Sequence, residues 1–407
     1  MATMALTWRY LFQRKLYWST NFTNIHYKTF AKHNFKRFIF VLEVTSSSKQ
    51  LKTSPHGKMS ISNGIKKARS TIPKIIGTHN GTFHCDEVLA CFMLKQLPEY
   101  ENAEIIRSRD VKQLLEKCNV IVDVGGIFDH KRRLYDHHQK TFQETMSSLN
   151  TDFGNEFNIR LSSAGLIYNY YGREIIKCIL KKHKNVELSE EHLSLCFKII
   201  YRKFIMEIDA IDNGVPMFEN GEPLYKISTH LSARIGHFNP SWDEENVNIE
   251  ERFQNAIAAA GLEFTQCVID IGSSWINARE HVRKAIENSK SIHESGEILF
   301  LEKFCPWKLH LSELEKEYGI DGIPKLVIFS ENHKSWRVAG VPVAPDSFVG
   351  RKFLPPAWRG LNDKMLSDVA SIPNLIFVHH SGFIGGAKTK EAAIAMAIKS
   401  ITMTEQN

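Results

Sequence analysis

The sequence predicts an α/β protein with two domains, and three observations support this prediction. At 407 residues the chain exceeds one ordinary hydrophobic core. From residue 72 onward, short apolar runs of strand length alternate with longer helical segments, which is the pattern of a mostly parallel sheet covered by helices. Hydrophobic residues make up 43% of the chain and charged residues 24%, in line with a globular protein.

The first 70 residues differ in composition from the rest of the chain. They hold 13 Lys or Arg residues and a single acidic residue, Glu43, whereas residues 71–407 hold 39 basic and 44 acidic residues. A basic leader rich in Ser, Thr and aromatic residues is typical of a mitochondrial transit peptide, which places the protein in the mitochondrial matrix. The alternative for this segment is a disordered basic arm, and its run Lys66-Lys67-Ala68-Arg69 also fits a weak nuclear signal.

The elements of the first domain follow from its apolar pattern. A strand at 74–77 opens into the polar loop THNGTFHCDE, and an apolar helix then runs until Pro98. A strand at 103–108, a helix at 111–118 and a strand at 119–125 follow, and long helical stretches lie at 162–183 and 193–214. In parallel sheets the ligand site lies beyond the carboxyl ends of the strands. We therefore expect the site in the polar segments that follow these strands.

The second half begins with helices and ends with a mixed region. Strands are predicted at 296–302, 325–330 and 336–343 and a helix at 308–318. A last strand at 374–380 leads through a glycine-rich turn into a helix from 392. The predicted organisation is a leader at 1–70, a catalytic α/β domain at 71–230, a helical linker region at 231–292 and a C-terminal α/β domain at 293–407.

Several classes of protein are disfavoured by the composition. The seven cysteines are scattered without a C-x-x-C pair, which indicates reduced thiols and argues against a disulfide frame or a structural zinc site. No apolar run reaches the roughly 20 residues that span a bilayer, so no membrane insertion is expected. Because residues 71–407 carry an excess of acidic residues, binding of a polyanion there needs a local basic patch or bound metal.

Side chains that can bind metal cluster at the predicted strand ends. His79, His84 and Asp86 lie in the loop after the first strand, Asp123 follows the third, and Asp136-His137-His138 comes soon afterwards. Taken singly, Asp86 could simply begin a helix and Asp123 could be a turn residue. Together they form an imidazole and carboxylate set that suits Mn²⁺, Fe²⁺, Zn²⁺ or Mg²⁺, and the nitrogen ligands favour Mn²⁺ over Mg²⁺. Two cations sharing a carboxylate would activate water against a phosphate ester or anhydride.

Two further groups complete the candidate site. Asp209 and Asp212 stand one helical turn apart, so both carboxylates can lie on one face. Glycines placed between a strand and a helix let backbone N–H groups approach an anion, although a tight connection explains them equally well. The substrate-binding candidates in and beyond this segment are His380, Gly382, Gly385, Gly386, Lys388 and, less directly, Arg234.

Nine segments carry a resemblance to a known family. They are GTHNGTFHCDE, VIVDVGG, YDHHQ, LSSAGLIY, DAIDNG, LSARI, CPWK, WRGL and FVHHSGFIGG. Together they resemble the melanocyte proliferating gene exonuclease family, a branch of the DHH phosphoesterase superfamily, from about residue 72 to 400. By this resemblance His79 and Asp86 are first-motif metal ligands and Asp123 bridges both metals. The chain departs from the superfamily pattern because the first motif is one residue longer and His84 replaces the usual carboxylate.

The resemblance also implies roles for the other site residues. His137 is a metal ligand, Asp136 supports the imidazoles, and His138 contacts phosphate or donates a proton to the leaving group. Asp209 is the preferred ligand from the fourth motif, ahead of Asp212. The segment HHSGFIGG resembles the substrate-gripping element of the accessory domain.

The function implied is 3′-to-5′ exonuclease action on RNA, releasing nucleoside monophosphates, in mitochondria with a nuclear pool. RNA enters as the substrate only through the resemblance. Two alternatives stay open. One is a phosphatase or pyrophosphatase acting on small nucleotides, and the other is a metal-bound regulatory module without turnover.

Overall fold

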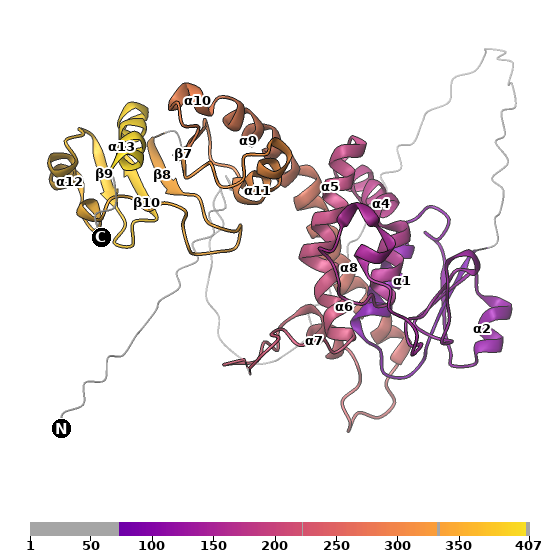
Figure 1. The fold of residues 1–407 in the computed structure, drawn as a ribbon. Coiled ribbons are helices and arrows are strands. Elements are labelled where there is room, and N and C mark those ends of the chain that lie inside the picture. The colour runs from indigo at the N-terminus through magenta and orange to yellow at the C-terminus, as the bar shows by residue number, and fades with distance from the viewer. Residues whose placement is uncertain (1–72, 222, 332–333, 404–407) are drawn as a thin grey trace, which may run out of the picture. The chain divides into compact units, whose positions relative to one another are not determined.

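A computed structural model describes residues 73–403 except 222 and 332–333 (Figure 1). The chain divides into two units, residues 1–68 and 69–407, and all described residues belong to the second unit. The predicted leader at 1–70 therefore lies outside the described residues. The α/β fold class predicted from the sequence is confirmed, because two five-stranded sheets alternate with helices in this part of the chain.

The first sheet is mostly parallel, as the sequence predicted. Its strand order is β2-β1-β3-β5-β4, and every neighbouring pair is parallel except β5 and the edge strand β4. Residues alternate between its two faces, so that Val120 and Val122 join the main core while Ile121 packs with Leu114 on the opposite face. The strands are β1 Ile75–Thr78, β2 Glu104–Arg107, β3 Val120–Val122, β4 Phe128–Asp129 and β5 Leu134–Tyr135.

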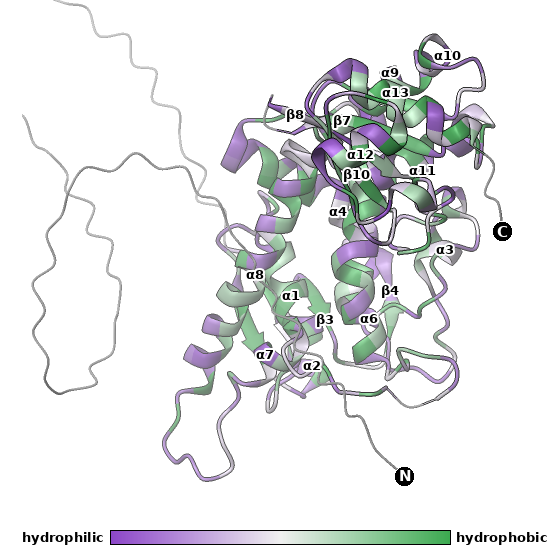
Figure 2. Ribbon diagram, turned by 90° about the vertical axis from the view of Figure 1, so that its left-hand side faces the viewer, coloured by the Kyte–Doolittle hydropathy of each residue, from purple (hydrophilic) through white to green (hydrophobic). Residues whose placement is uncertain are grey.

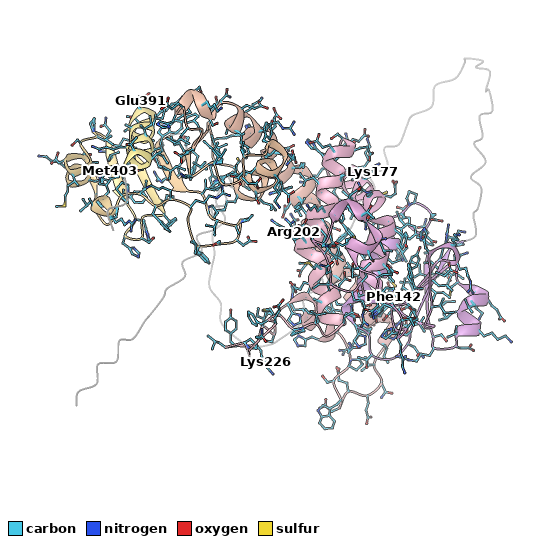
Figure 3. The ribbon with its side chains drawn as sticks, viewed as in Figure 1. Phe142, Lys177, Arg202, Lys226, Glu391 and Met403 are labelled. Carbon is cyan, nitrogen blue, oxygen red and sulfur yellow. The ribbon has the colours of Figure 1, made fainter. Side chains whose placement is uncertain are left out.

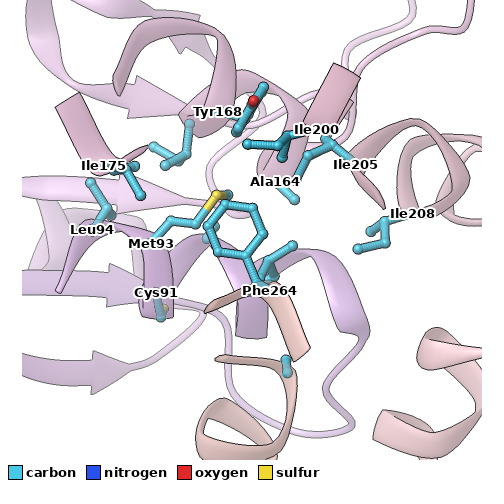
Figure 4. Packing of buried hydrophobic residues seen from close by; sticks show 14 of the residues in the cluster. Cys91, Met93, Leu94, Ala164, Tyr168, Ile175, Ile200, Ile205, Ile208 and Phe264 are labelled. Carbon is cyan, nitrogen blue, oxygen red and sulfur yellow. The ribbon is translucent and has the colours of Figure 1, made fainter. Parts of the chain in front are cut away.

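Helices bury the main core against this sheet. The side chains drawn in Figure 4 come from several of these helices, among them Met93 of α1, Tyr168 of α4 and Phe264 of α8. The long helices are amphipathic, and Figure 2 shows purple and green segments alternating along α8. The helical elements here are α1 Cys85–Leu94, α2 Val111–Lys117, η1 His130–Arg132, α3 Met146–Leu149, η2 Thr151–Phe153, α4 Ser163–Lys184, α5 Glu190–Ile200, the π turn η3 Tyr201–Ile205, α6 Met206–Asp212, α7 Leu231–Gly236 and α8 Ile249–Ser273.

The region 231–292, expected as a helical linker, is divided between two cores. Buried residues of α8 from Phe253 to Ile271 belong to the same core as β1 and α1. Gly261 lies directly against the ring of Phe92, so a side chain at this position would separate α8 from α1. The next long helix, α9, packs with the second sheet instead. These helices are therefore structural parts of the cores on either side.

The second sheet is mostly antiparallel. Its order is β6-β7-β8-β10-β9, and only β6 and β7 are parallel. Along β7, Leu326 and Ile328 pack with α12 and α13, whereas Val327 and Phe329 pack with α9 and α11, so helices cover both faces. The elements are η4 Trp275–Asn277, α9 Ala278–Glu287, α10 Ser289–Ile292, β6 Ile298–Leu301, α11 Trp307–Tyr318, β7 Leu326–Glu331, β8 Ser335–Gly340, η5 Pro356–Trp358, α12 Asp363–Ala370, β9 Leu375–Val378, β10 Ile384–Ala387 and α13 Lys390–Thr402.

In the described part of the chain, none of the helices combines the length and apolar content needed to cross a membrane.

Candidate metal centre

The polar side chains predicted at the strand ends meet at one edge of the first sheet. His79 follows β1, Asp123 follows β3 and Asp136 follows β5. These three strands are parallel neighbours, so their carboxyl ends open on the same side. Helix α1 begins beside them, and its first turn contributes the buried carboxylates of Asp86 and Glu87.

One group of metal-binding atoms is built around His79. The ligand atoms of His79, His84, Glu87 and Asp123 all lie within 4.8 Å of one another. The Nε2 atom of His79 is 3.1 Å from Oε1 of Glu87 and 3.3 Å from Oδ2 of Asp123. Its Nδ1 atom lies 3.1 Å from the carbonyl oxygen of Asn80, so a proton on Nδ1 leaves the lone pair of Nε2 directed at the carboxylates.

A second group is built around His137. Its members are Asp86, His137 and Asp212, whose ligand atoms also lie within 4.8 Å of one another. The Nε2 atom of His137 is 3.1 Å from Oδ2 of Asp212, 3.4 Å from Oδ1 of Asp123 and 4.0 Å from Oδ2 of Asp86. Phe142, labelled in Figure 3, packs edge-on against the His137 ring with the ring centres 6.4 Å apart. Asp123 therefore presents one oxygen to each group.

The buried atoms of the second group lack the hydrogen bonds that such atoms normally make. Both carboxylate oxygens of Asp86 and both ring nitrogens of His137 are buried without a hydrogen-bond partner. An unsatisfied buried carboxylate is costly unless it is paired with a charge or coordinates a metal. Burial, followed by the nearby charges of Asp123 and Asp212, raises the pKa of the Asp86 carboxyl well above its usual range.

The pKa values of His79, His137 and Asp123 are shifted in the directions that favour ion pairs between them. Burial lowers the pKa of His79, but Asp123 and Glu87 outweigh it and raise that pKa to about 10. Burial likewise lowers the pKa of His137, while Asp123 and Asp212 raise it to about 10. Burial raises the pKa of Asp123, but His137 and His79 hold it well below its usual range. Protons on these imidazoles occupy the place that a cation would take, and this donor set fits divalent metal ions.

Asp123 is held in an unusual backbone conformation. Its φ angle is +55°, in the left-handed region that non-glycine residues seldom adopt. Its N–H donates to the carbonyl oxygen of Tyr135 at 3.0 Å, and the hydroxyl of Ser163 donates to its Oδ1 at 3.2 Å. Strain of this kind persists only where the surrounding structure enforces it, and it concentrates at functional sites.

Asp136 and His138 form a pair beside the two groups. Oδ1 of Asp136 accepts the backbone N–H of His138 at 3.0 Å and lies 2.8 Å from Nδ1 of its ring. This hydrogen bond raises the pKa of His138. The imidazole side chain is 64% exposed, so it reaches solvent at the rim, in contrast to the buried His137. The Nδ1 atom of His138 is also 3.5 Å from Oδ1 of Asp123.

Of the two candidate carboxylates on α6, the structure brings Asp212, and not Asp209, to the metal-binding groups. Asp209 is fully buried and accepts hydrogen bonds from the N–H and hydroxyl of Ser162 and from the hydroxyl of Tyr201. Its carboxylate also lies against Gly165, where a Cβ atom would collide with it. These contacts occupy Asp209 in the core, so the carboxylate that reaches His137 is that of Asp212.

The structure places the substrate-binding candidates of the glycine-rich segment in different elements. Gly385 and Gly386 lie inside β10, which pairs with β8 on one side and β9 on the other. His380 and Gly382 belong to the turn before this strand, and Lys388 follows its far end. A four-residue strand separates the two ends by roughly 13 Å, so the turn residues His380 and Gly382 do not lie beside Lys388.

Arg234, the remaining substrate-binding candidate, is engaged elsewhere. Its guanidinium binds both carboxylate oxygens of Glu263 on α8. The pocket at the metal centre is lined instead by other parts of α7, including Ser232, Ala233 and Gly236. Arg234 thus lies on the helix that borders the site, but outside the lining of the pocket.

The whole of this region matches a known family. The MYG1 exonuclease family model, described as an uncharacterised protein family (UPF0160), matches residues 75–401. This chain belongs to the MYG1 exonuclease family. The match covers both sheets and every residue of the metal centre, and it leaves the leader outside.

Relatives in other organisms agree with this assignment. A MYG1 protein of Caenorhabditis elegans is 46% identical over 337 residues, covering 82% of this chain and 96% of the relative. The proteins named MYG1 exonuclease in Bos taurus and Homo sapiens are 44% and 43% identical, covering 84% and 82% of this chain and 90% and 87% of the relatives. No solved structure matches this MYG1 family chain.

Several residues of the centre were not predicted from the sequence. Glu87 and Ser163 contact the metal-binding atoms, as described above, and Arg109 and His230 line a pocket of about 640 Å³ that opens onto them. Glu87 was detectable, since an acid three residues after His84 fits a capping box, and its carboxylate does accept the His84 N–H at 2.9 Å. Nothing local marks Arg109, because it reaches the pocket only through the pairing of β2 with β1.

Proposed function

We propose that this protein is a metal-dependent phosphodiesterase that removes nucleoside monophosphates from the 3′ end of RNA. The observation that carries the proposal is the convergence of the unpartnered atoms of Asp86 and His137 with Asp123, which faces both groups of metal-binding side chains. The relatives named exonuclease support hydrolysis of phosphodiester bonds. The preference for RNA and the 3′-to-5′ direction rest on the family resemblance.

The two groups of side chains suit two divalent cations. His79, His84, Glu87 and Asp123 would hold one, and Asp86, His137, Asp212 and Asp123 would hold the other. The chemistry expected of such a pair is activation of water and neutralisation of charge on the phosphoryl group. The three imidazoles favour Mn²⁺ over Mg²⁺, because Mg²⁺ prefers oxygen ligands and retained waters.

Side chains at the rim of the pocket would bind the substrate and donate a proton to it. Asp136 holds Nδ1 of His138 and favours its protonated form, so Nε2 can donate a proton to the departing oxygen. Among the described residues that line the pocket, Arg109 has the only permanent positive charge. Its guanidinium is suited to hold a phosphate of the bound strand.

The test uses purified protein, Mn²⁺ and RNA labelled at its 5′ end. We expect stepwise shortening from the 3′ end with release of nucleoside monophosphates, and loss of activity on chelation that added Mn²⁺ restores. A 3′-phosphorylated RNA and a DNA of the same sequence serve as controls for end recognition and sugar preference. Degradation that survives chelation, or that begins inside the strand, would contradict the proposal.

A second candidate function is hydrolysis of small nucleotides. The excess of acidic residues in 71–407 favours it, because the overall field of this region repels a long polyanion. Short oligonucleotides, dinucleotides and pyrophosphate tested beside long RNA separate the two candidates. Faster turnover per bond on the short substrates, with none on RNA, would select the second.

We also propose that the protein resides in the mitochondrial matrix, with a nuclear pool. The basic leader at 1–70 supports import. A fluorescent fusion of the full chain should co-localise with a matrix marker, and removal of residues 1–70 should abolish this. Unchanged mitochondrial signal after the deletion would contradict the role of the leader.

A further inference from the structure

Two side chains outside the metal centre hold the backbone of the loop that carries His79 and His84. We infer that Arg107 and Asn239 are positioning residues for this loop and that they set the affinity of the cation held by His79, His84, Glu87 and Asp123. The inference rests on the proposed function, since it concerns one of the two cations assigned there. Neither residue touches the reacting groups.

Arg107 fixes the middle of the loop. It ends β2, and its Nη2 atom donates to the carbonyl oxygen of Gly81 at 2.7 Å. The side chain is only 1% exposed, with Glu250 at 3.3 Å and the ring centre of Phe253 at 4.3 Å. A guanidinium this deeply buried is costly to desolvate. The ion pair, the aromatic face and the loop carbonyl offset part of this cost, while its Nε atom makes no hydrogen bond to the described residues.

Asn239 fixes the end of the loop. Its side-chain amide accepts the N–H of Phe83 at 3.0 Å and donates to the carbonyl oxygen of the same residue at 2.8 Å. Phe83 is fully buried and packs edge-on against Phe253 at 5.4 Å. Because Phe83 directly precedes His84, these two hydrogen bonds hold the backbone that presents the His84 imidazole, together with the Glu87 carboxylate that accepts the His84 N–H.

Arg107 and Asn239 hold the part of the loop that lies between the two ligand-bearing ends. Residues 80–82 are exposed and belong to no strand or helix. The second group of ligands depends on this loop less, because Asp212 stands on α6 and His137 follows β5, and only Asp86 stands near it, in the first turn of α1. Loss of a residue that orients metal ligands typically weakens metal binding by about 10–100-fold. The effect should therefore fall on one cation and spare the other.

The experiment measures Mn²⁺ binding to the full chain by electron paramagnetic resonance of free Mn²⁺. We expect wild type to bind two ions and Asn239→Ala to weaken one of them by about 10–100-fold, with the other changed by less than about threefold. His84→Ala should weaken the same ion. Asn239→Asp keeps the acceptor for the Phe83 N–H and should give a smaller loss. Asn158→Ala, which removes an exposed local hydrogen bond, is the matched control.

The outcomes separate this inference from the proposed function. Two ions in wild type with both affinities unchanged in Asn239→Ala overturn the positioning role alone. An equal loss of both ions, accompanied by a lower melting temperature in chelator, assigns Asn239 a purely structural role and also overturns it. A wild-type protein that binds no Mn²⁺ overturns the proposed function itself. Arg107→Lys is a second variant. It keeps a positive charge and a hydrogen-bond donor but lacks the planar guanidinium, and it should again weaken the binding of one Mn²⁺ ion only.

Discussion

The two sheets of this protein have equal numbers of strands, but the polar segments that follow their strands are placed differently. In the first sheet β1, β2, β3 and β5 run parallel, so the segments after β1, β3 and β5 meet at one edge and form the metal centre. In the second sheet β8, β10 and β9 are antiparallel, so successive connections lie at opposite edges. Side chains far apart in sequence converge in the first arrangement and separate in the second.

The comparison extends to packing. The metal centre at the first sheet buries the Asp86 carboxylate and the His137 imidazole, whose polar atoms make no hydrogen bonds, and a bound cation would offset the free-energy cost of burying them. The second sheet uses its glycines to bring strands and helices into close contact. Substitutions of the metal-binding side chains should therefore change metal binding and activity, and substitutions of the closely packed glycines in the second sheet should change stability.

The largest effect is expected for Asp123→Ala. Both metal-binding groups lose the carboxylate that they share, so activity should fall by more than the roughly 100-fold upper limit for an orienting residue. Initial rates of RNA hydrolysis and the number of bound Mn²⁺ ions measure the change. Asp152→Ala, at an exposed position, should keep wild-type rates. Half or more of the activity remaining in Asp123→Ala would remove Asp123 from the centre.

Substitutions of the two aspartates on α6 should affect different properties of the protein. Asp212→Ala should lower activity about 100-fold with little change in stability, since its carboxylate faces His137. Asp209→Ala leaves the buried groups of Ser162 and Tyr201 without an acceptor and should lower the free energy of unfolding by about 1–3 kcal/mol. Rates and denaturant unfolding distinguish the two, and a reversed pattern would restore Asp209 as the ligand.

The pH dependence of stability gives a separate test of Asp209. Burial raises its pKa to about 7, above the value of about 3.9 for an unfolded aspartate. Its stabilising contribution is therefore complete below about pH 4 and is lost as the pH rises through about 7. In metal-free protein, Asp209→Asn should gain stability relative to wild type as the pH is raised from about 4 to about 8. A difference that stays constant over this interval would mean that Asp209 does not titrate there.

A smaller effect, on stability alone, is expected for Gly385→Ala in the second sheet. The added Cβ atom would lie 2.7 Å from the Leu354 side chain and 3.1 Å from both the Met396 sulfur and the Phe377 carbonyl oxygen. Overpacking of this kind costs about 1–3 kcal/mol, measurable by denaturant unfolding, while Mn²⁺ binding should be unchanged. Ser381→Ala in the preceding turn should stay within about 0.5 kcal/mol of wild type. Weaker Mn²⁺ binding in Gly385→Ala would contradict the expectation that packing in the second sheet affects stability alone.

The smallest effect is expected for Lys388→Ala. The residue is exposed, so stability should change by less than about 0.5 kcal/mol. If it contacts one RNA phosphate, the slope of log affinity against log salt should become shallower by about 0.7. Binding titrations at several salt concentrations measure this, with Lys316→Ala as an exposed control. An unchanged slope would exclude Lys388 from the RNA-binding surface.

Much of the fold could be predicted from the sequence because buried parallel strands are short apolar runs with polar residues at their ends. The strands before His79 and Asp123 are where that pattern indicated, and α1 begins at the acidic turn that follows His84. The prediction of a turn at Gly385 and Gly386 was wrong. It rested on the general tendency of Gly-Gly to occur in turns, whereas both residues lie in β10. Here β8 and β9 satisfy the backbone of β10 from both sides, and close packing excludes larger side chains.

Local apolar periodicity and residue chemistry are enough to predict the α/β class and the set of imidazoles and carboxylates available for metal binding. Which of these side chains meet depends on how the helices and strands pack. The choice of Asp212 over Asp209 depends on how α6 leaves the π turn 201–205 and packs beside Ser162 and Gly165. Contacts of this kind join residues about 45 positions apart, and no local pattern in the chain encodes them.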